Sequence, residues 1–244
     1  MKLCIVTGAS RGLGAALAEQ LMARGDRVLG IARRHNLALA QGGQESWTAD
    51  LANPQPVAER LQSWLHRQGP GAFSELVLIN NAGVVTPPGP VQAVPLAQLS
   101  SALRVGLEAT LLLSAAFLAA TEQWGRPRKI MNISSGLGRR AMAAAAPYCA
   151  AKAGMDHLSR AMAMDEALKP NGARIVSIAP GIIDTDMQVQ LRSADPAAFP
   201  DQPRFAAFKA DGALETAEAV AAKLLRYLDR ADYGADPVAD IRDV

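Results

Sequence analysis

Apolar residues follow two alternating patterns along this chain. Short apolar runs predict buried strands, and longer segments with apolar residues at three- and four-residue spacing predict helices. The predicted strands are Leu3–Thr7, Arg27–Ala32, Ser46–Ala49, Leu76–Asn80, Lys129–Ser134 and Ala173–Ala179, with a weaker seventh at Pro237–Ile241. The predicted helices are Leu13–Arg24, Gln55–Arg67, Leu103–Thr121, Pro147–Leu168 and Thr216–Leu228. This alternation is typical of successive βα units and a parallel sheet.

The element order therefore predicts an α/β fold. We expect residues 1–244 to form one doubly wound (Rossmann) domain, with a seven-stranded, mainly parallel sheet and helices on both faces. One segment, Asp184–Asp211, departs from the pattern because it is rich in Pro, Asp and Phe. A connection of that length inside a compact domain is usually functional, so we expect a substrate loop or lid that contains short helical pieces.

Composition narrows the class of protein further. Half of the 244 residues are apolar and one fifth are charged, which is enough to bury the core of one large domain. The net charge is only +2 and the basic residues are scattered, which argues against nucleic-acid binding. Cys4 and Cys149 lack the spacing of a metal site and predict thiols in a reducing compartment.

The sequence also predicts a cytoplasmic protein without membrane contact. The N-terminus enters the first predicted strand directly, leaving no room for a signal peptide. The most apolar stretch, Leu107–Ala120, is shorter than the roughly 20 residues that span a bilayer. A helix buried in the core or in a subunit interface accounts for it better.

A glycine-rich turn follows the first predicted strand and opens the first predicted helix. Its spacing is G-x-x-x-G-x-G, and its residues are Gly8, Ser10, Arg11, Gly12, Leu13 and Gly14. Glycines in this position permit a tight turn and a close approach of the backbone to a pyrophosphate at the helix N-terminus. The spacing alone is moderately specific, because any strand-turn-helix junction can use glycines.

Basic residues at the end of the second strand indicate the cofactor. Arg33 and Arg34 stand where an NAD site places an acidic residue against the ribose 2′-hydroxyl. Together with Arg11 they offer a positive pocket for a 2′-phosphate, which guanidinium groups bind in a charge-assisted way. NADPH is therefore the expected cofactor. The alternative is that these arginines are ordinary solvated charges.

Tyr148 and Lys152 are the candidate chemical groups, with Ser135 just after the fifth strand. Positions i and i+4 of a helix lie about 6 Å apart on one face, so the Lys152 ammonium can lie beside the Tyr148 phenol. One ammonium at about 4 Å supplies about 4 kcal/mol in an effective dielectric near 20. That suffices to bring a phenol pKa of about 10 near neutrality. We therefore expect Tyr148 to donate a proton to a substrate oxygen to which Ser135 also donates a hydrogen bond.

In order and spacing, these motifs resemble those of the short-chain dehydrogenase/reductase family over nearly the whole chain. The resemblance extends to Asp50-Leu51, Asn80-Asn81-Ala82-Gly83 and Pro180-Gly181-Ile182-Ile183-Asp184-Thr185. It implies that Ser135, Tyr148 and Lys152 are catalytic. The cofactor contacts that it implies are Asp50 and Leu51 at the adenine, Asn81, Ala82 and Gly83 at the ribose, Ile182 and Thr185 at the nicotinamide, and Tyr148, Lys152, Pro180, Gly181, Ile183 and Met187.

One position departs from the family pattern. The family usually has an asparagine in the helix before the fifth strand, where it positions a water in a proton relay, whereas this chain has Gly106. Mid-helix glycine costs about 1 kcal/mol relative to alanine, so it is not there for helix stability. Either a water fills the gap or the relay is weakened. The second outcome favours a rival class, a cofactor-binding regulatory or scaffold protein with little turnover.

The C-terminal third resembles the sepiapterin reductase and benzil reductase branch of the family, on Ala179–Gln188, Phe208-Lys209 and the acidic end with Asp240 and Asp243. The resemblance implies NADPH-dependent reduction of a ketone in an aromatic diketone or a pterin. Asp240 is then either a pterin anchor or a solvated acid. A general 3-oxoacyl or steroid-type ketoreductase is the alternative on the same scaffold.

We expect an apolar substrate pocket suited to a flat aromatic ketone. Its expected lining is Leu137, Met142, Met187, Phe199, Phe205, Phe208 and Asp240. The apolar helices Gly106–Ala120 and Pro147–Leu168 resemble those that pair across family dimers, so a homodimer or homotetramer is expected.

Overall fold

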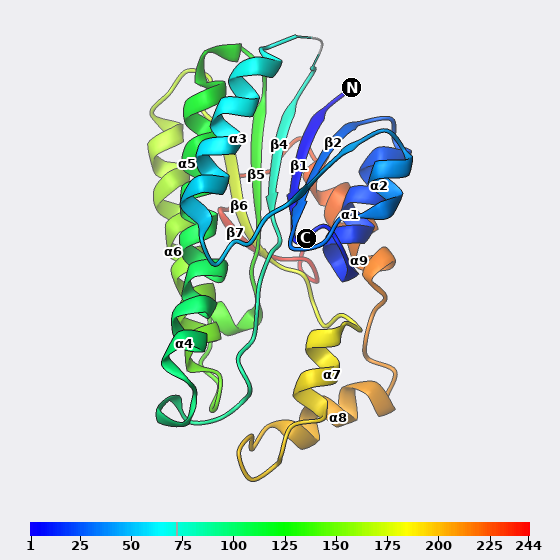
Figure 1. Cartoon of the computed structure of the whole chain (residues 1–244), viewed down its shortest axis with the longest axis vertical. Coiled ribbons are helices and arrows are strands. Elements are labelled where there is room, and N and C mark those ends of the chain that lie inside the picture. The colour runs from blue at the N-terminus through cyan, green and yellow to red at the C-terminus, as the bar shows by residue number, and fades with distance from the viewer. Residues whose placement is uncertain (72) are drawn as a thin grey trace.

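Seven strands form one sheet in the order β3-β2-β1-β4-β5-β6-β7, and every neighbouring pair is parallel. The computed structural model describes residues 1–71 and 73–244. Its strands are β1 (Leu3–Thr7), β2 (Arg27–Ala32), β3 (Glu45–Thr48), β4 (Leu76–Asn80), β5 (Arg128–Ile133), β6 (Arg174–Ala179) and β7 (Val238–Asp240). The strand order reverses between β1 and β4 (Figure 1), and sheets of this kind bind ligands beyond the carboxyl ends of the strands at that point. The predicted doubly wound fold is confirmed.

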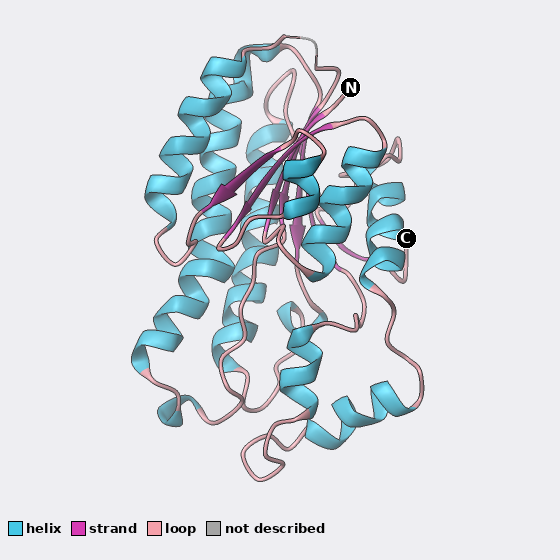
Figure 2. Ribbon diagram, turned by 45° about the vertical axis from the view of Figure 1, so that its right-hand side comes forward, coloured by secondary structure: helices cyan, strands magenta, loops and turns pink. Residues whose placement is uncertain are grey.

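Helices cover both faces of the sheet (Figures 1 and 2). On one face lie α1 (Gly12–Ala23), α2 (Leu37–Gln41) and α9 (Ala217–Leu228), and on the other lie α3 (Pro54–Gln68), α5 (Ala109–Thr121) and α6 (Ala146–Ala167). Each strand contributes side chains to the hydrophobic core on both faces of the sheet, because successive side chains point to opposite faces. In β1, Leu3 and Ile5 belong to the layer of α3 and α5, and Cys4 and Val6 to that of α1.

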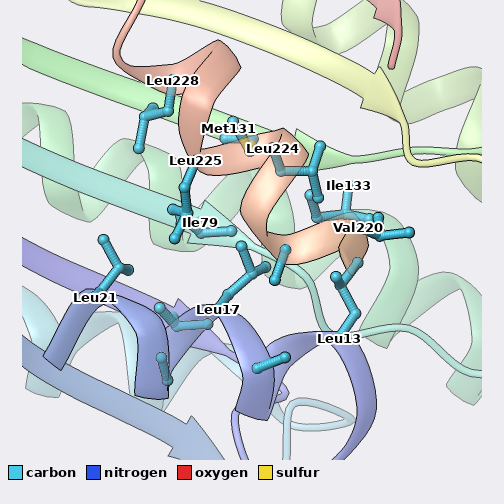
Figure 3. Packing of buried hydrophobic residues seen from close by; sticks show 14 of the residues in the cluster. Leu13, Leu17, Leu21, Ile79, Met131, Ile133, Val220, Leu224, Leu225 and Leu228 are labelled. Carbon is cyan, nitrogen blue, oxygen red and sulfur yellow. The ribbon is translucent and has the colours of Figure 1, made fainter. Parts of the chain in front are cut away.

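Leucines from α1 and α9 meet over the middle of the sheet (Figure 3). Leu17 and Leu224 are fully buried there, above Ile79 and Met131 of the central strands. Truncation of such a side chain to alanine typically costs about 2–5 kcal/mol. This packing fixes the first turn of α1, and with it the glycine-rich turn, against the sheet.

The predicted helix Leu103–Thr121 begins earlier than its sequence pattern indicated. Helix α4 (Leu96–Leu103) continues through a π-helical turn, η2 (Arg104–Glu108), into α5 and a final turn η3 (Glu122–Trp124). This run of 29 residues is long and apolar enough to cross a bilayer. The expectation that the apolar stretch Leu107–Ala120 is too short to span one was therefore wrong, because the helix extends beyond it at both ends. Half of its most apolar window is buried within the fold, where residues such as Leu113 and Phe117 form core.

The Asp184–Asp211 segment contains the short helical pieces predicted for it. They are α7 (Asp186–Arg192) and α8 (Gln202–Ala210), and they stand beyond the carboxyl edge of the sheet (Figures 1 and 2). Phe205 packs between Phe199 and Phe208, with ring centroids 5.4 and 5.7 Å apart. Asp184 receives hydrogen bonds from Lys209 at 2.5 Å and Arg192 at 3.3 Å. The segment therefore has a small core and ion pairs of its own.

Candidate active site

One cavity of about 800 Å³ lies at the carboxyl edge of the sheet, under the α7–α8 segment. All the residues that the sequence analysis assigned to a site line it. They are Gly8, Ser10, Arg11, Gly12, Leu13, Gly14, Arg33, Arg34, Asp50, Leu51, Asn81, Ala82, Gly83, Ser135, Leu137, Met142, Tyr148, Lys152, Pro180, Gly181, Ile182, Ile183, Thr185, Met187, Phe199, Phe205, Phe208 and Asp240. The fold thus brings segments from the whole chain around one space.

The glycine-rich turn is packed too closely to admit side chains. A Cβ on Gly14 would overlap the carbonyl of Gly8 and the Asn81 side-chain amide, and Gly8 itself has φ +66°. Thr7 connects this turn to the end of the neighbouring strand β4. Its hydroxyl accepts hydrogen bonds from the backbone N–H groups of Asn81 and Ala82, both at 3.0 Å. These contacts hold the turn against the end of β4, and the turn lines the cavity at the N-terminus of α1.

Sequence reasoning missed Asn36, which supports the same turn. Its buried side chain donates to the Ala9 carbonyl at 2.8 Å and accepts from the Leu39 N–H at 3.0 Å, capping α2. An asparagine before a short apolar stretch is a capping signal that was available in the sequence. The five-residue helix itself was too short to be recognised by periodicity.

The three arginines expected at a 2′-phosphate are not equivalent in the structure. Arg33 and Arg34 line the cavity and form no ion pair within the part of the chain that the structure describes. Arg11 instead pairs with Asp186 in the first turn of α7, where both side chains are largely exposed. The positive charge left free at the end of β2 therefore comes from Arg33 and Arg34.

Ser135, Tyr148 and Lys152 lie at the other end of the cavity. Ser135 follows β5 and its hydroxyl accepts from the Leu137 N–H at 3.2 Å, while Tyr148 and Lys152 are one turn apart on α6. The Lys152 ammonium is 5.7 Å from the centroid of the Tyr148 ring and donates to the Ile133 carbonyl at 2.6 Å. The spacing predicted from the sequence is therefore realised, with the ammonium turned toward the end of β5.

The electrostatics differ from the sequence-based expectation for Tyr148. Burial raises the pKa of its phenol, and the neighbouring Ser135 hydroxyl opposes that shift. Lys152 is itself buried, which lowers the pKa of its ammonium to about 8, while the charge of Asp156 acts in the opposite direction. The expected lowering of the Tyr148 pKa by Lys152 is therefore not present in this arrangement, because the ammonium interacts with the ring and a carbonyl rather than with the hydroxyl.

The end of the cavity under α7 and α8 combines aromatic side chains with cationic groups that sequence reasoning missed. Arg140, Arg204 and Arg242 also line the cavity. Asp240, the candidate pterin anchor, is held by Arg242 at 2.6 and 2.8 Å and lies 3.8 Å from Arg139. These ion pairs lower the pKa of the Asp240 carboxyl, with the Arg242 hydrogen bonds as the largest cause. Asp240 is therefore a paired acid at the cavity wall.

Gly106 lies in the π-helical turn η2 and faces α6. A Cβ added to it would lie 3.0 Å from the Cβ of Ala151, a contact that forces one of the two to move. A Cβ at this position therefore meets Ala151, the residue before Lys152, more closely than ordinary packing allows.

A profile of the short chain dehydrogenase family matches residues 2–196 of the chain. The fold, the glycine-rich turn and the Ser135-Tyr148-Lys152 group agree with that match. The chain therefore belongs to the short-chain dehydrogenase family, and it is an oxidoreductase of that family.

Relatives that are 27–30% identical cover nearly the whole chain. Benzil reductase ((S)-benzoin forming) of Bacillus cereus is 30% identical over 239 residues, 96% of each chain. Sepiapterin reductase of Rattus norvegicus is 30% identical over 260 aligned residues, 99% of this chain and 97% of its own. A metagenomic short-chain oxidoreductase, crystallised in complex with NADP, is 27% identical, with a TM-score of 0.72 and coverage of 97% of this chain and 95% of its own.

Replacement Gly106→Asn is expected to destabilise the fold. Overpacking against Ala151 should lower the free energy of unfolding by about 1–3 kcal/mol, measured by chemical denaturation. The double variant Gly106→Asn/Ala151→Gly should recover most of the loss, because it removes the opposing Cβ. A single variant as stable as the wild type would show that Ala151 does not restrict this position.

Proposed function

We propose that the protein is an NADPH-dependent carbonyl reductase that acts on a ketone of an aromatic diketone or a pterin-type compound, with Tyr148 as proton donor. The observation that carries this proposal is the shape of the cavity. One end is lined by the glycine-rich turn with Arg33 and Arg34, and the other by Ser135, Tyr148 and Lys152. Their connection in one space supports a reaction between a long, phosphorylated cofactor and a small substrate.

The residues present fit a dinucleotide. Close packing against the turn itself and Asn81 requires glycine at positions 8 and 14, and the turn so formed holds the N-terminus of α1 at the cavity, where a pyrophosphate would bind. Arg33 and Arg34 supply guanidinium groups for a 2′-phosphate, and a relative of the same family was crystallised with NADP. When bound, this cofactor supplies the hydride for reduction of a carbonyl.

The chain itself supplies the proton and the electrostatic support. The Tyr148 hydroxyl donates a proton to the oxygen as the carbonyl becomes an alkoxide, and the Ser135 hydroxyl donates a hydrogen bond to the same oxygen. Lys152 keeps a cation beside the Tyr148 ring, and an ammonium that turned from the Ile133 carbonyl to the phenol oxygen would favour loss of the phenol proton. Leu137 and Met142 provide an apolar wall, which excludes water from the reacting oxygen.

The α7–α8 segment supports an aromatic substrate. Phe205 and Phe208 face the same cavity as Tyr148, and Met187 adds an adaptable apolar surface. The similarity to benzil reductase and sepiapterin reductase supports the same class of ketones. A general 3-oxoacyl or steroid-type ketoreductase is the competing activity, and a weakly active cofactor-binding protein is the competing non-enzymatic function.

Tyr148→Phe is expected to lower kcat for ketone reduction by about 100-fold or more, because the variant loses its proton donor but little volume. The Kd for NADPH should stay within a factor of about two, since the hydroxyl contributes little to cofactor binding. Tyr227→Phe on α9 is the matched control and should retain activity, because Tyr227 does not line the cavity. Retention of most activity by Tyr148→Phe would exclude Tyr148 as the acid.

The ratio of kcat/KM for NADPH and NADH tests the cofactor assignment. We expect the wild type to prefer NADPH, and Arg33→Asp to reverse the preference, because a carboxylate repels a 2′-phosphate and accepts a ribose hydroxyl. The control Arg126→Asp makes the same charge change just before β5, at the amino ends of the strands and away from the cavity. It should leave the ratio unchanged. An equal or better value with NADH in the wild type contradicts the assignment.

A substrate panel with NADPH separates the candidate activities. We expect the highest kcat/KM for a phenyl diketone, and a similar effect of Asp240→Ala on the diketone and on a pterin, because Arg242 already occupies this carboxylate. Loss confined to the pterin would instead identify Asp240 as its anchor. Highest activity on a 3-oxoacyl thioester or a steroid ketone would favour the competing reductase. Binding of NADPH without turnover of any substrate would favour the regulatory function.

A further inference from the structure

Helix α6 carries a buried carboxylate one turn beyond Lys152. Asp156 is only 2% exposed and lies on the same side of the helix as Lys152. Its Oδ1 accepts hydrogen bonds from the hydroxyls of Ser134, at 2.5 Å, and Ser177, at 2.6 Å. The proposed chemistry does not use any of these three polar groups.

This carboxylate connects the helix to two neighbouring strands. Ser134 follows β5 directly and precedes Ser135, and Ser177 lies within β6. The register pairs Asn132 of β5 with Ser177, so Ser134 lies two positions closer to the carboxyl edge than Ser177, on the same face of the sheet. A single oxygen atom therefore holds both strands against α6.

The turn that follows Ser135 contacts the helix at the same place. This turn, η4 (Gly136–Gly138), comes so close that a Cβ on Gly138 would lie 2.7 Å from Oδ2 of Asp156 and 2.9 Å from the Lys152 carbonyl oxygen. The Nε of Arg139 lies 3.5 Å from the same Oδ2, which has no hydrogen-bond partner among the residues that the structure describes. Asp156 therefore contacts the chain both before Ser135, at Ser134, and after it, at Gly138 and Arg139.

We propose that Asp156 is a positioning residue, which holds the Ser134–Gly138 segment, and with it the Ser135 hydroxyl, against the helix that bears Tyr148 and Lys152. The inference rests on the proposed function, because the relative position of these groups matters when they act on one substrate oxygen. Packing alone does not explain a carboxylate here, since an apolar side chain of similar size fills such a space without the cost of desolvating a charge.

The charge of Asp156 has a second effect, on Lys152. Burial lowers the pKa of Lys152 to about 8, and Asp156 raises it. The other titratable and charged groups around this pair are Tyr148 and Cys149 on α6, Arg139 after η4, and Asp240 and Arg242 at the end of β7. Loss of the Asp156 charge therefore lowers the pKa of Lys152 further. The alkaline limb of the pH profile of kcat, where the Lys152 cation is lost, then moves to lower pH.

Asp156→Asn tests both effects, because it is nearly isosteric, keeps an oxygen for the serines and removes the charge. With NADPH and a phenyl diketone, we expect kcat to fall about tenfold or more, with KM nearly unchanged. The alkaline limb should move to lower pH than in the wild type. Hydrogen exchange gives a readout independent of turnover, and the amides of residues 137–140 should exchange about tenfold faster than in the wild type.

Ser177→Ala is the matched control. It removes one of the two hydrogen bonds to the same oxygen, but it keeps the charge and lies away from Ser135. We expect a lower melting temperature with kcat, the pH profile and exchange at 137–140 close to the wild type. Ser134→Ala is the second variant if Asp156→Asn does not fold. It should lower kcat and speed exchange at 137–140 without moving the alkaline limb.

The outcomes separate this inference from the proposed function. A wild type that reduces no ketone contradicts the proposed function, whereas faster exchange at 137–140 in Asp156→Asn still supports the positioning role. The role of Asp156 is overturned if Asp156→Asn shows the kcat, pH profile and exchange of the wild type. If Ser134→Ala replaces that variant, wild-type kcat and exchange in Ser134→Ala overturn the role. Equal losses of kcat in Ser177→Ala and Asp156→Asn overturn it as well, because they would reflect general destabilisation.

Discussion

Parallel pairing of β1, β4, β5 and β6 brings four strand ends to one edge of the sheet, and the chemistry of the molecule depends on that edge. Buried polar side chains join these ends to one another and to α6. Asn80 donates to Asn132 at 2.9 Å, and Asn132 donates to Ser159 of α6 at 2.8 Å. A buried polar group left without a partner costs about 1–3 kcal/mol. The bonds that satisfy these groups therefore also fix the segments that carry the candidate site residues.

The sequence predicted the parts of the fold that depend on local pattern. Strands such as Leu76–Asn80 are apolar runs that end at a polar residue, so their bounds follow from the residues themselves. The Tyr148–Lys152 pair could be placed on one face because helical spacing decides it. Side chains that share the cavity were also predictable, since parallel strands deliver their following loops to the same edge.

Features that depend on contacts between distant segments were not predictable. Asp156 looks like an ordinary helical acid until the sheet brings Ser134 and Ser177 against it. The pairing of Arg11 with Asp186 joins residues 175 positions apart, so no local pattern separates Arg11 from the other cavity arginines. The π-helical turn at Gly106 was missed because the apolar period runs through it without a break.

The pair formed by Arg11 and Asp186 joins the glycine-rich turn to α7, which borders the opposite end of the cavity. Both side chains are mostly exposed, at 57% and 72%, so water compensates readily when they separate. The pair therefore contributes little to the position of α7. That position depends instead on the chain's own connection through Thr185 and on the packing of α7 against α8.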